Sequence, residues 1–145
     1  MTYATRADME DRFGAGEIAE RAEDPDSPGF DRTAPALAEA SAIIDSYLGV
    51  AYALPLPAGS WPLLREIQCD IARTELYDDA TLDAPKAMKK DAVKRLEMLR
   101  DGKLALTDGA GNIVDRRNVA VRRGPPRVMT DDNLAGLNDT GRHVL

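Results

Sequence analysis

The sequence changes character near residue 106, and this change limits what the chain can fold into. Residues 1–106 carry regularly spaced apolar residues between polar turns, whereas residues 107–145 are rich in glycine, aspartate and arginine. A segment of the second kind cannot build a core alone, so it is ordered only by a partner or by copies of its own chain. We therefore expect a helical body over residues 1–106 and an extended arm over residues 107–145, in a component of an assembly.

Charge is divided unevenly between the body and the arm. The arm holds six arginines against five aspartates, and the whole chain has a net charge of −6, so the body carries −7. An acidic body disfavours tight nucleic-acid binding, because phosphate contacts need lysine and arginine. The chain has no apolar run near about 18 residues and no N-terminal signal pattern, so we expect a soluble protein with no membrane contact.

The first segment predicts a short helix followed by a loop. Thr5 and Asp8 form a capping pattern at the helix start. Phe13 and Gly14 mark its end, because glycine readily adopts the left-handed conformation that stops a helix. Residues 23–29, Glu-Asp-Pro-Asp-Ser-Pro-Gly, predict a loop that is neither helix nor strand.

Residues 33–51 predict the clearest helix of the chain. Thr33 is its expected N-cap, and Pro35 is tolerated in the first turn. The apolar residues follow a single helical stripe, Leu37, Ala40, Ile44, Tyr47, Leu48 and Ala51. Two prolines after this helix make residues 54–57 an extended connector.

A third helix, capped by Ser60 and running to Tyr77, is apolar on two sides. One arc holds Leu63, Leu64, Ile67 and Ile71, and the other holds Cys69, Ala72 and Leu76. A helix of this kind is sandwiched between two neighbours, and we expect one of them to be another subunit. The predicted subunit interface consists of Cys69, Asp70, Ala72, Arg73 and Leu76.

Asp70 stands beside the first apolar arc of this third helix. Its carboxylate needs a partner there, since burying an unpaired charge is costly. Arg73, three residues further on, is one candidate, and a residue of a neighbouring chain is the other. The sequence leaves both partners open.

The fourth helix is expected from Asp83 to Asp101, with its core stripe at Met88, Ala92, Leu96 and Leu99. Its remaining surface is strongly charged, as in an outer helix with a solvated face. Residues 108–112 are turn-forming, so the flanking apolar runs at 104–106 and 113–114 predict a small hairpin, and residues 118–121 predict a further strand. The fold class is therefore all-α, a four-helix body with an extended tail that contains short β segments.

The residues give little support to catalysis or to a bound cofactor or metal. His143, the only histidine, stands three residues from the end of the chain, where a rigid active site is not expected. Cys69 lies among leucine and isoleucine, which is typical of a core residue rather than a nucleophile. Asp24 and Asp26 faintly resemble the start of a calcium loop, but prolines occupy later ligand positions. We expect no enzyme activity, no cofactor and no metal.

Five arginines between residues 116 and 127 form the one concentrated positive segment. This segment is either a solvated linker or a docking segment for an acidic partner, because arginine offers forked, charge-assisted hydrogen bonds. The predicted docking residues of the arm are Arg116, Arg117, Arg122, Arg123, Arg127, Val128, Met129, Leu134 and Leu137.

Five segments stand in order along the chain, Tyr3–Asp8 with Arg12–Gly14, Ala42–Gly49 with Tyr52–Leu56, Cys69–Arg73, Leu96–Leu106 and Arg127–Leu137. Together they resemble a family of proteins from Mu-like phages and prophages, formerly catalogued as a domain of unknown function and regarded as head–tail connector, or adaptor, proteins. The likeness covers nearly the whole chain.

This resemblance implies a structural protein of the virion. Such adaptors form a ring, commonly of twelve copies, beneath the portal protein at the head–tail junction, after assembly in the host cytoplasm. DNA passes through the ring, and a stopper or tail-completion protein follows. A C-terminal extension reaches the portal. Two alternatives stay open, namely a stopper or tail-completion protein and a small helical regulator that binds a host protein.

Overall fold

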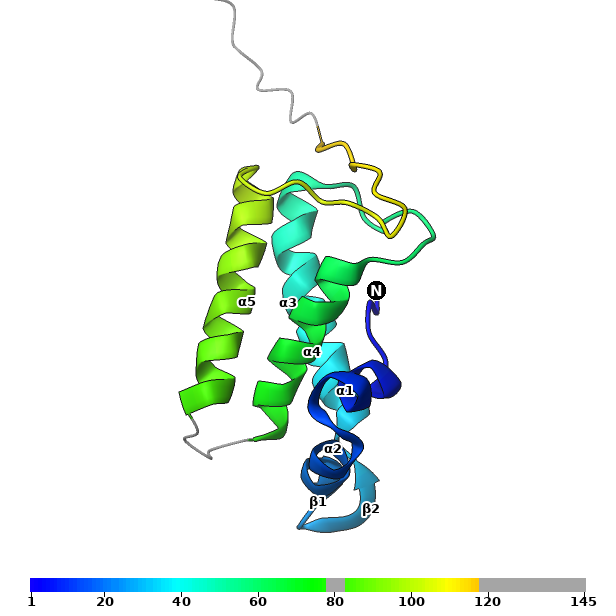
Figure 1. Ribbon diagram of the computed structural model, residues 1–145, viewed down its shortest axis with the longest axis vertical. Coiled ribbons are helices and arrows are strands. Elements are labelled where there is room, and N and C mark those ends of the chain that lie inside the picture. The colour runs from blue at the N-terminus through cyan, green and yellow to red at the C-terminus, as the bar shows by residue number, and fades with distance from the viewer. Residues whose placement is uncertain (78–82, 118–145) are drawn as a thin grey trace, which may run out of the picture.

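The computed structural model describes residues 1–77 and 83–117 and shows a bundle of helices with a small hairpin at one end (Figure 1). The elements in chain order are α1 (Arg6–Phe13), α2 (Ala15–Ala22), β1 (Glu23–Asp24), β2 (Ser27–Asp31), α3 (Thr33–Ala51), α4 (Pro62–Leu76) and α5 (Asp83–Asp101). The described residues thus contain five helices and one two-stranded sheet, so the expected four-helix, all-α body is correct only in being mostly helical.

Helix α1 begins and ends where the sequence predicts. The Thr5 backbone N–H donates to Asp8 Oδ2 at 2.7 Å, and the Asp8 N–H donates back to Thr5 Oγ1 at 3.4 Å. These two bonds complete the capping box. Gly14 stops the helix at a φ of 98°, a backbone conformation that side chains rarely adopt.

The predicted loop at residues 23–29 is wrong, and α2 was missed. Strand β1 pairs antiparallel with β2 through Glu23 opposite Asp31 and Asp24 opposite Ser27. All residues of β2 are exposed, so the sequence lacks the alternating apolar pattern that marks a strand. Helix α2 buries only Ile18 and Ala22, too few apolar positions to show a helical period.

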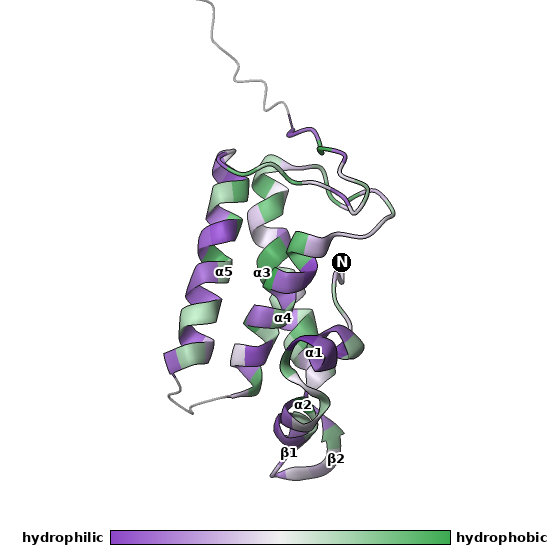
Figure 2. Ribbon diagram, in the orientation of Figure 1, coloured by the Kyte–Doolittle hydropathy of each residue, from purple (hydrophilic) through white to green (hydrophobic). Residues whose placement is uncertain are grey.

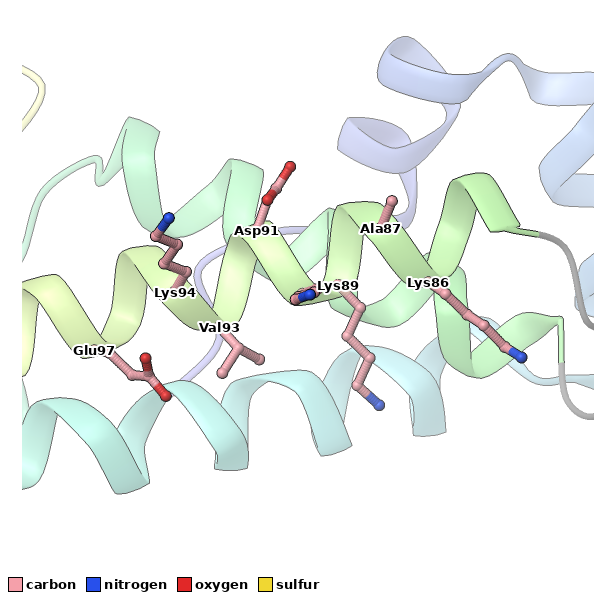
Figure 3. A pocket seen from close by; sticks show the side chains of 8 residues that line it. Lys86, Ala87, Lys89, Asp91, Val93, Lys94 and Glu97 are labelled. Carbon is pink, nitrogen blue, oxygen red and sulfur yellow. The ribbon is translucent and has the colours of Figure 1, made fainter.

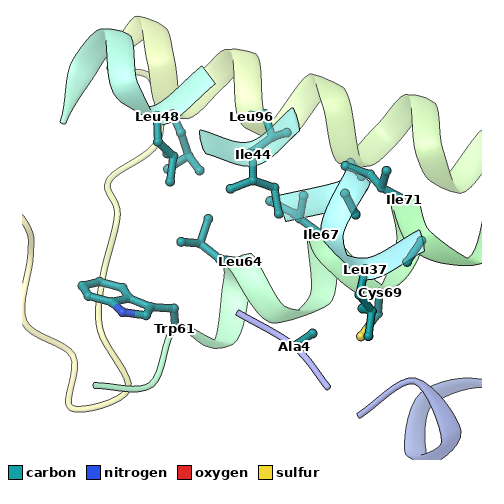
Figure 4. Close-up of a cluster of buried hydrophobic side chains, with 14 of the residues drawn as sticks. Ala4, Leu37, Ile44, Leu48, Trp61, Leu64, Ile67, Cys69, Ile71 and Leu96 are labelled. Carbon is teal, nitrogen blue, oxygen red and sulfur yellow. The ribbon is translucent and has the colours of Figure 1, made fainter. Parts of the chain in front are cut away.

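Helices α3, α4 and α5 pack against one another around the main core (Figures 1 and 4). The stripe predicted for α3 is confirmed, except that Tyr47 is half-buried. Its Ile44 and Leu48 meet Leu64 and Ile67 of α4 and Leu96 of α5 in one fully buried cluster. Each such side chain contributes about 1.5–3 kcal/mol through removal of apolar surface from water.

The caps predicted for α3 and α4 are each displaced by one residue. Thr33 is the first residue of α3, and its backbone N–H donates to Asp31 Oδ1 at 2.8 Å. Asp31 therefore supplies the polar group expected of Thr33. At α4 the N-cap is Trp61 rather than Ser60, and no side chain caps it.

Residues 102–117, named the strap here, run back over one end of the bundle (Figure 1). Leu106 is fully buried, and an antiparallel bridge joins Thr107 to Ile113, as the predicted hairpin requires. The N–H of Gly109 donates to Ser60 O at 2.8 Å, and the N–H of Arg117 donates to Ala51 O at 2.7 Å. The first eleven residues of the expected arm therefore pack on the body. The rest of that arm, residues 118–145, lies outside the described residues together with the strand expected at 118–121.

Candidate assembly interface

Most of the α4 residues predicted to face a neighbouring subunit are buried inside their own chain. Cys69, Ala72 and Leu76 are at most 2% exposed, and Asp70 is 5% exposed. Helix α1 lies against this side of α4, and Cys69 points toward the N-terminal segment at Ala4 (Figures 1 and 4). The second apolar arc is thus covered by the N-terminal helices, so in this arrangement these four side chains leave no surface for another subunit.

Asp70 is paired with Arg12 of α1, which was neither of the partners that the sequence suggested. Arg12 Nε lies 2.9 Å from Asp70 Oδ1, and Arg12 Nη2 lies 3.2 Å from Oδ2. This forked pair joins α1 to the middle of the bundle. Burial raises the pKa of Asp70, and the Arg12 guanidinium offsets that rise only in part. The partner of Asp70 therefore lies within its own chain, and the pair holds α1 against α4.

Arg73, the fifth predicted interface residue, fastens α2 in the same way. Its Nε donates to Glu17 Oε1 at 2.8 Å, and the Tyr77 hydroxyl donates to the same oxygen at 2.5 Å. The guanidinium also lies 4.5 Å from the centre of the Phe13 ring. Burial alone raises the pKa of Glu17, but the bonds from Tyr77 and Arg73 hold it below its ordinary value. The carboxylate therefore stays charged and keeps α2 on α4.

Sequence reasoning missed Gln68, a fully buried polar residue on α4. Its Oε1 accepts the backbone N–H groups of Tyr3 and Ala4, both at 2.7 Å, and its Nε2 donates to Leu37 O at 2.8 Å. One amide thus ties the N-terminal segment to α3 and α4. The only signal in the sequence was an uncharged polar residue at a position between the two apolar arcs.

Two residues that the sequence analysis weighed for chemistry, Cys69 as a nucleophile and Asp24 as a calcium ligand, lie in the described part of the chain. Burial raises the pKa of the Cys69 thiol to about 12, so the thiol stays protonated at neutral pH. The Asp24 carboxylate accepts the backbone N–H of Asp26 at 2.9 Å, which is a turn contact within the hairpin. Within residues 1–77 and 83–117, no three metal-binding side chains gather, and no helix is long and apolar enough to cross a membrane.

Only two of the predicted docking residues of the arm lie in the described part, and both contact the body. The Arg116 guanidinium donates to the carbonyl of Arg100 at the end of α5, and the Arg117 backbone is bound to Ala51. The other predicted docking residues, and His143, lie outside the described residues: Arg122, Arg123, Arg127, Val128, Met129, Leu134 and Leu137.

Three apolar side chains are exposed on the segments that the strap joins. Val50 is 60% exposed, Leu54 is 37% exposed and Ile113 is 69% exposed. Val50 precedes Ala51, where the strap is anchored, and Ile113 belongs to the strap itself. Of the three, Val50 stands next to the residue at which Arg117, the last residue of the strap, is bound.

The outer side of α5 carries a row of lysines. Lys86, Lys90 and Lys94 are exposed at a spacing of four residues and make no ion pair with any described residue. They line a groove of about 830 Å³ that also includes Ala87, Val93, Lys89 and two carboxylates, Asp91 and Glu97 (Figure 3). We call the three lysines the lysine face. Lys89, between them in sequence, reaches Glu75 of α4 at 2.6 Å.

The N-terminal part of the chain carries the opposite charge. Residues 6–31 hold nine carboxylates against three arginines, a net charge of −6. Several of these carboxylates are neutralised internally, but Glu20, Glu23 and Asp26 are exposed and make no ion pair among the described residues. Together with Asp24 they form what we call the acidic edge, at the end of α2 and along the hairpin.

Comparison with known proteins gives two matches over most of the chain. Residues 3–122 match the family model described as "Bacteriophage Mu, Gp36". The chain is also 36% identical over 106 residues to the protein named "Gene product J" of Escherichia phage Mu, an alignment that covers 71% of this chain and 74% of that protein.

Proposed function

The chain belongs to the Gp36 family of bacteriophage Mu, and from this premise we propose that it is a head–tail connector, an adaptor that forms a ring beneath the portal protein. Membership of a phage family supports a role in the structure or assembly of a virion. The proposed place of action is the head–tail junction, reached after assembly in the host cytoplasm.

The observation that carries this proposal is that the strap is anchored on the body at its last residue, Arg117. The N–H of Arg117 is bound to Ala51 O, so the strap ends at a fixed point on the body, the carboxyl end of α3. Val50, beside that point, is exposed, and so are Leu54 and Ile113 on the segments that the strap joins. A rigid helical body with a sequence-distinct arm starting beside exposed apolar residues suits a protein that holds two neighbours together.

In this function the body tiles the ring and the remainder of the arm, residues 118–145, docks on the portal or on neighbouring subunits. Arginine suits that role because its guanidinium makes forked bonds to carboxylates. We propose twelve copies around a channel, with a stopper or tail-completion protein on the side away from the portal. A surplus of carboxylates on the body lets DNA pass without binding, because like charges repel phosphate. The work is mechanical and architectural, and no chemical step is proposed.

The test is attachment of the purified full chain to particles that carry the portal but lack this protein. The wild-type chain is expected to sediment with the particles. A variant with Arg122→Ala, Arg123→Ala and Arg127→Ala is expected to lose most of that attachment. The matched control removes the same charge from the body surface through Arg65→Ala, Arg95→Ala and Arg100→Ala, and it should still attach if circular dichroism shows it folded.

Two results would contradict the proposal. A wild-type chain that never sediments with portal particles argues for a role outside the connector, such as a regulator that binds a host protein. Attachment only to particles that already carry another connector component assigns the chain to a stopper or tail-completion role.

A further inference from the structure

Within the proposed connector function, on which this inference rests, we propose that the lysine face of one copy docks on the acidic edge of the next copy. The lysine face is Lys86, Lys90 and Lys94 of α5, and the acidic edge is Glu20, Glu23, Asp24 and Asp26. Through these two surfaces, copies of this chain associate side by side.

The lysine face is costly for an isolated chain. Lys86, Lys90 and Lys94 are like charges at i, i+4 spacing, and such pairs destabilise a helix by a few tenths of a kcal/mol each. Carboxylates three residues away offset part of this cost at Lys86 and Lys94, but α5 has no carboxylate three or four residues from Lys90. Lys86 also stands near the amino-terminal end of α5, where a positive charge opposes the helix dipole. A local arrangement that costs stability without an internal partner indicates a contact made with another molecule.

Charge complementarity favours a second copy as that molecule. The three lysines extend over about 12 Å of helix, from the rise of about 1.5 Å per residue. The acidic edge presents Glu20, Glu23 and Asp26 with no ion pair among the described residues, so both surfaces have unused charge of opposite sign. Duplex DNA would also suit the lysines, but the net charge of −6 for the whole chain repels phosphate at longer range.

The two surfaces also stand in positions that permit a closed ring. Helix α5 lies on one side of α4, and α1, α2 and the hairpin lie on the other (Figure 1). A contact between two different surfaces of the same chain is heterologous, and it can repeat from copy to copy until a ring closes. An interface between identical surfaces would stop at a pair.

An apolar contact accompanies the charges. Phe30 of β2 is 52% exposed and borders the same hollows as Glu23 and Asp24. The groove of the lysine face offers Ala87 and Val93 between its charged residues. Exposed ion pairs contribute only about 0–1 kcal/mol each, so the charges set orientation and the Phe30 ring supplies apolar burial.

The experiment is a charge exchange in the full-length chain, followed by sedimentation velocity over a range of protein concentrations at low salt. One variant carries Lys90→Glu and Lys94→Glu, a second carries Glu20→Lys and Glu23→Lys, and a third combines all four changes. Each two-residue variant is expected to weaken self-association by about tenfold or more, because attractive pairs become repulsive. The combined variant is expected to recover self-association, because each reversed face again meets an opposite charge.

Two controls change charge elsewhere on the surface. Lys103→Glu and Asp115→Lys alter the net charge by the same amount per residue at the strap, and both should associate like the wild type. Raising the salt to about 0.5 M should weaken wild-type association, since exposed charges are then screened.

Several outcomes would overturn the proposal. They are a wild-type chain that stays monomeric at every concentration, a combined variant that does not recover, and two-residue variants that match the controls. A fourth is a Lys90→Glu, Lys94→Glu variant that loses retention of duplex DNA while keeping self-association, which would assign the face to nucleic acid.

The same variants separate this inference from the connector function. If all variants attach normally to portal particles, with unchanged copy number by quantitative electrophoresis, the contact between the lysine face and the acidic edge is contradicted and the connector function is kept. If self-association depends on charge but no variant attaches to portal particles, the contact is kept and the connector function is contradicted.

Discussion

Two neighbouring polar residues of α4, Gln68 and Asp70, hold the N-terminal segment to the body. Each makes its bonds across at least 31 residues of sequence, Gln68 to Tyr3, Ala4 and Leu37, and Asp70 to Arg12. Buried polar groups of this kind must keep every partner, because an unpaired one loses its hydration without compensation. Both residues are therefore sensitive points for stability.

Replacing Gln68 by leucine is expected to destabilise the fold by about 3 kcal/mol. The substitution keeps the volume but leaves the N–H groups of Tyr3 and Ala4 and the carbonyl of Leu37 without their partner. Urea unfolding followed by circular dichroism measures the change. Glu66→Gln, on an exposed position of the same helix, is the control and should change the free energy of unfolding by less than about 0.5 kcal/mol. An equally small change in Gln68→Leu would contradict the assignment.

The Asp70→Asn variant is expected to differ from the wild type in a pH-dependent way. The pKa of Asp70 is raised in the folded chain above its ordinary value of 3.8, so the folded state binds this proton more tightly than the unfolded state. The free energy of unfolding of the wild type, relative to the variant, should therefore fall as pH rises from 3.8 through the raised value, and then level off.

Urea unfolding at a series of pH values from about 3.5 to 7 provides this comparison. Asp115→Asn, at an exposed position of the strap, serves as the control and should show no such fall. A difference between wild type and Asp70→Asn that rises with pH would show that Arg12 outweighs the cost of burial.

Among the elements, α4 explains both the success and the failure of the sequence predictions. Its two apolar arcs correctly indicated a helix with neighbours on two sides. The sequence could not show that the second neighbour is α1 with α2, because α2 buries only two side chains and leaves no clear period. With α2 hidden, another subunit was the remaining explanation for Cys69, Ala72 and Leu76. Long-range pairs such as Arg12 with Asp70 carry no local pattern at all.

The strap is the element that changes the boundary between body and arm. A chain ending at Leu106 is expected to be about 2 kcal/mol less stable than one ending at Arg117. Without residues 107–117, the buried Leu106 loses its cover and the bond from the Val114 N–H. Calorimetric unfolding of the two truncated chains measures the difference.

A third chain ending at Arg117 and carrying Ile113→Ser is the control for this comparison, because that side chain is largely exposed. It should unfold with the chain ending at Arg117. Equal stability of the chains ending at Leu106 and Arg117 would show that the strap only rests on the body.

At the scale of the whole molecule, the sequence was most informative where residues act through short periods. The cap of α1 was correct, and so were the stripe of α3 except for half-buried Tyr47 and the core stripe of α5 except for half-buried Met88. It was least informative where exposed residues form structure through the backbone, as in β2, or where distant side chains meet. The sequence shows how much charge each part of the chain carries. Only the positions of α5 and α2 show that these charges gather into a lysine face and an acidic edge.

The anchoring of Arg117 at Ala51 determines how mechanical load would travel through the molecule. A pull on Arg117 acts first on its backbone hydrogen bond to the end of α3 and on the neighbouring Arg116 side chain, which is bound to the Arg100 carbonyl at the end of α5. Only afterwards does it act on the backbone bonds at Val114 and Gly109. A force applied at this point is therefore shared between the carboxyl ends of two core helices and does not act on one helix alone.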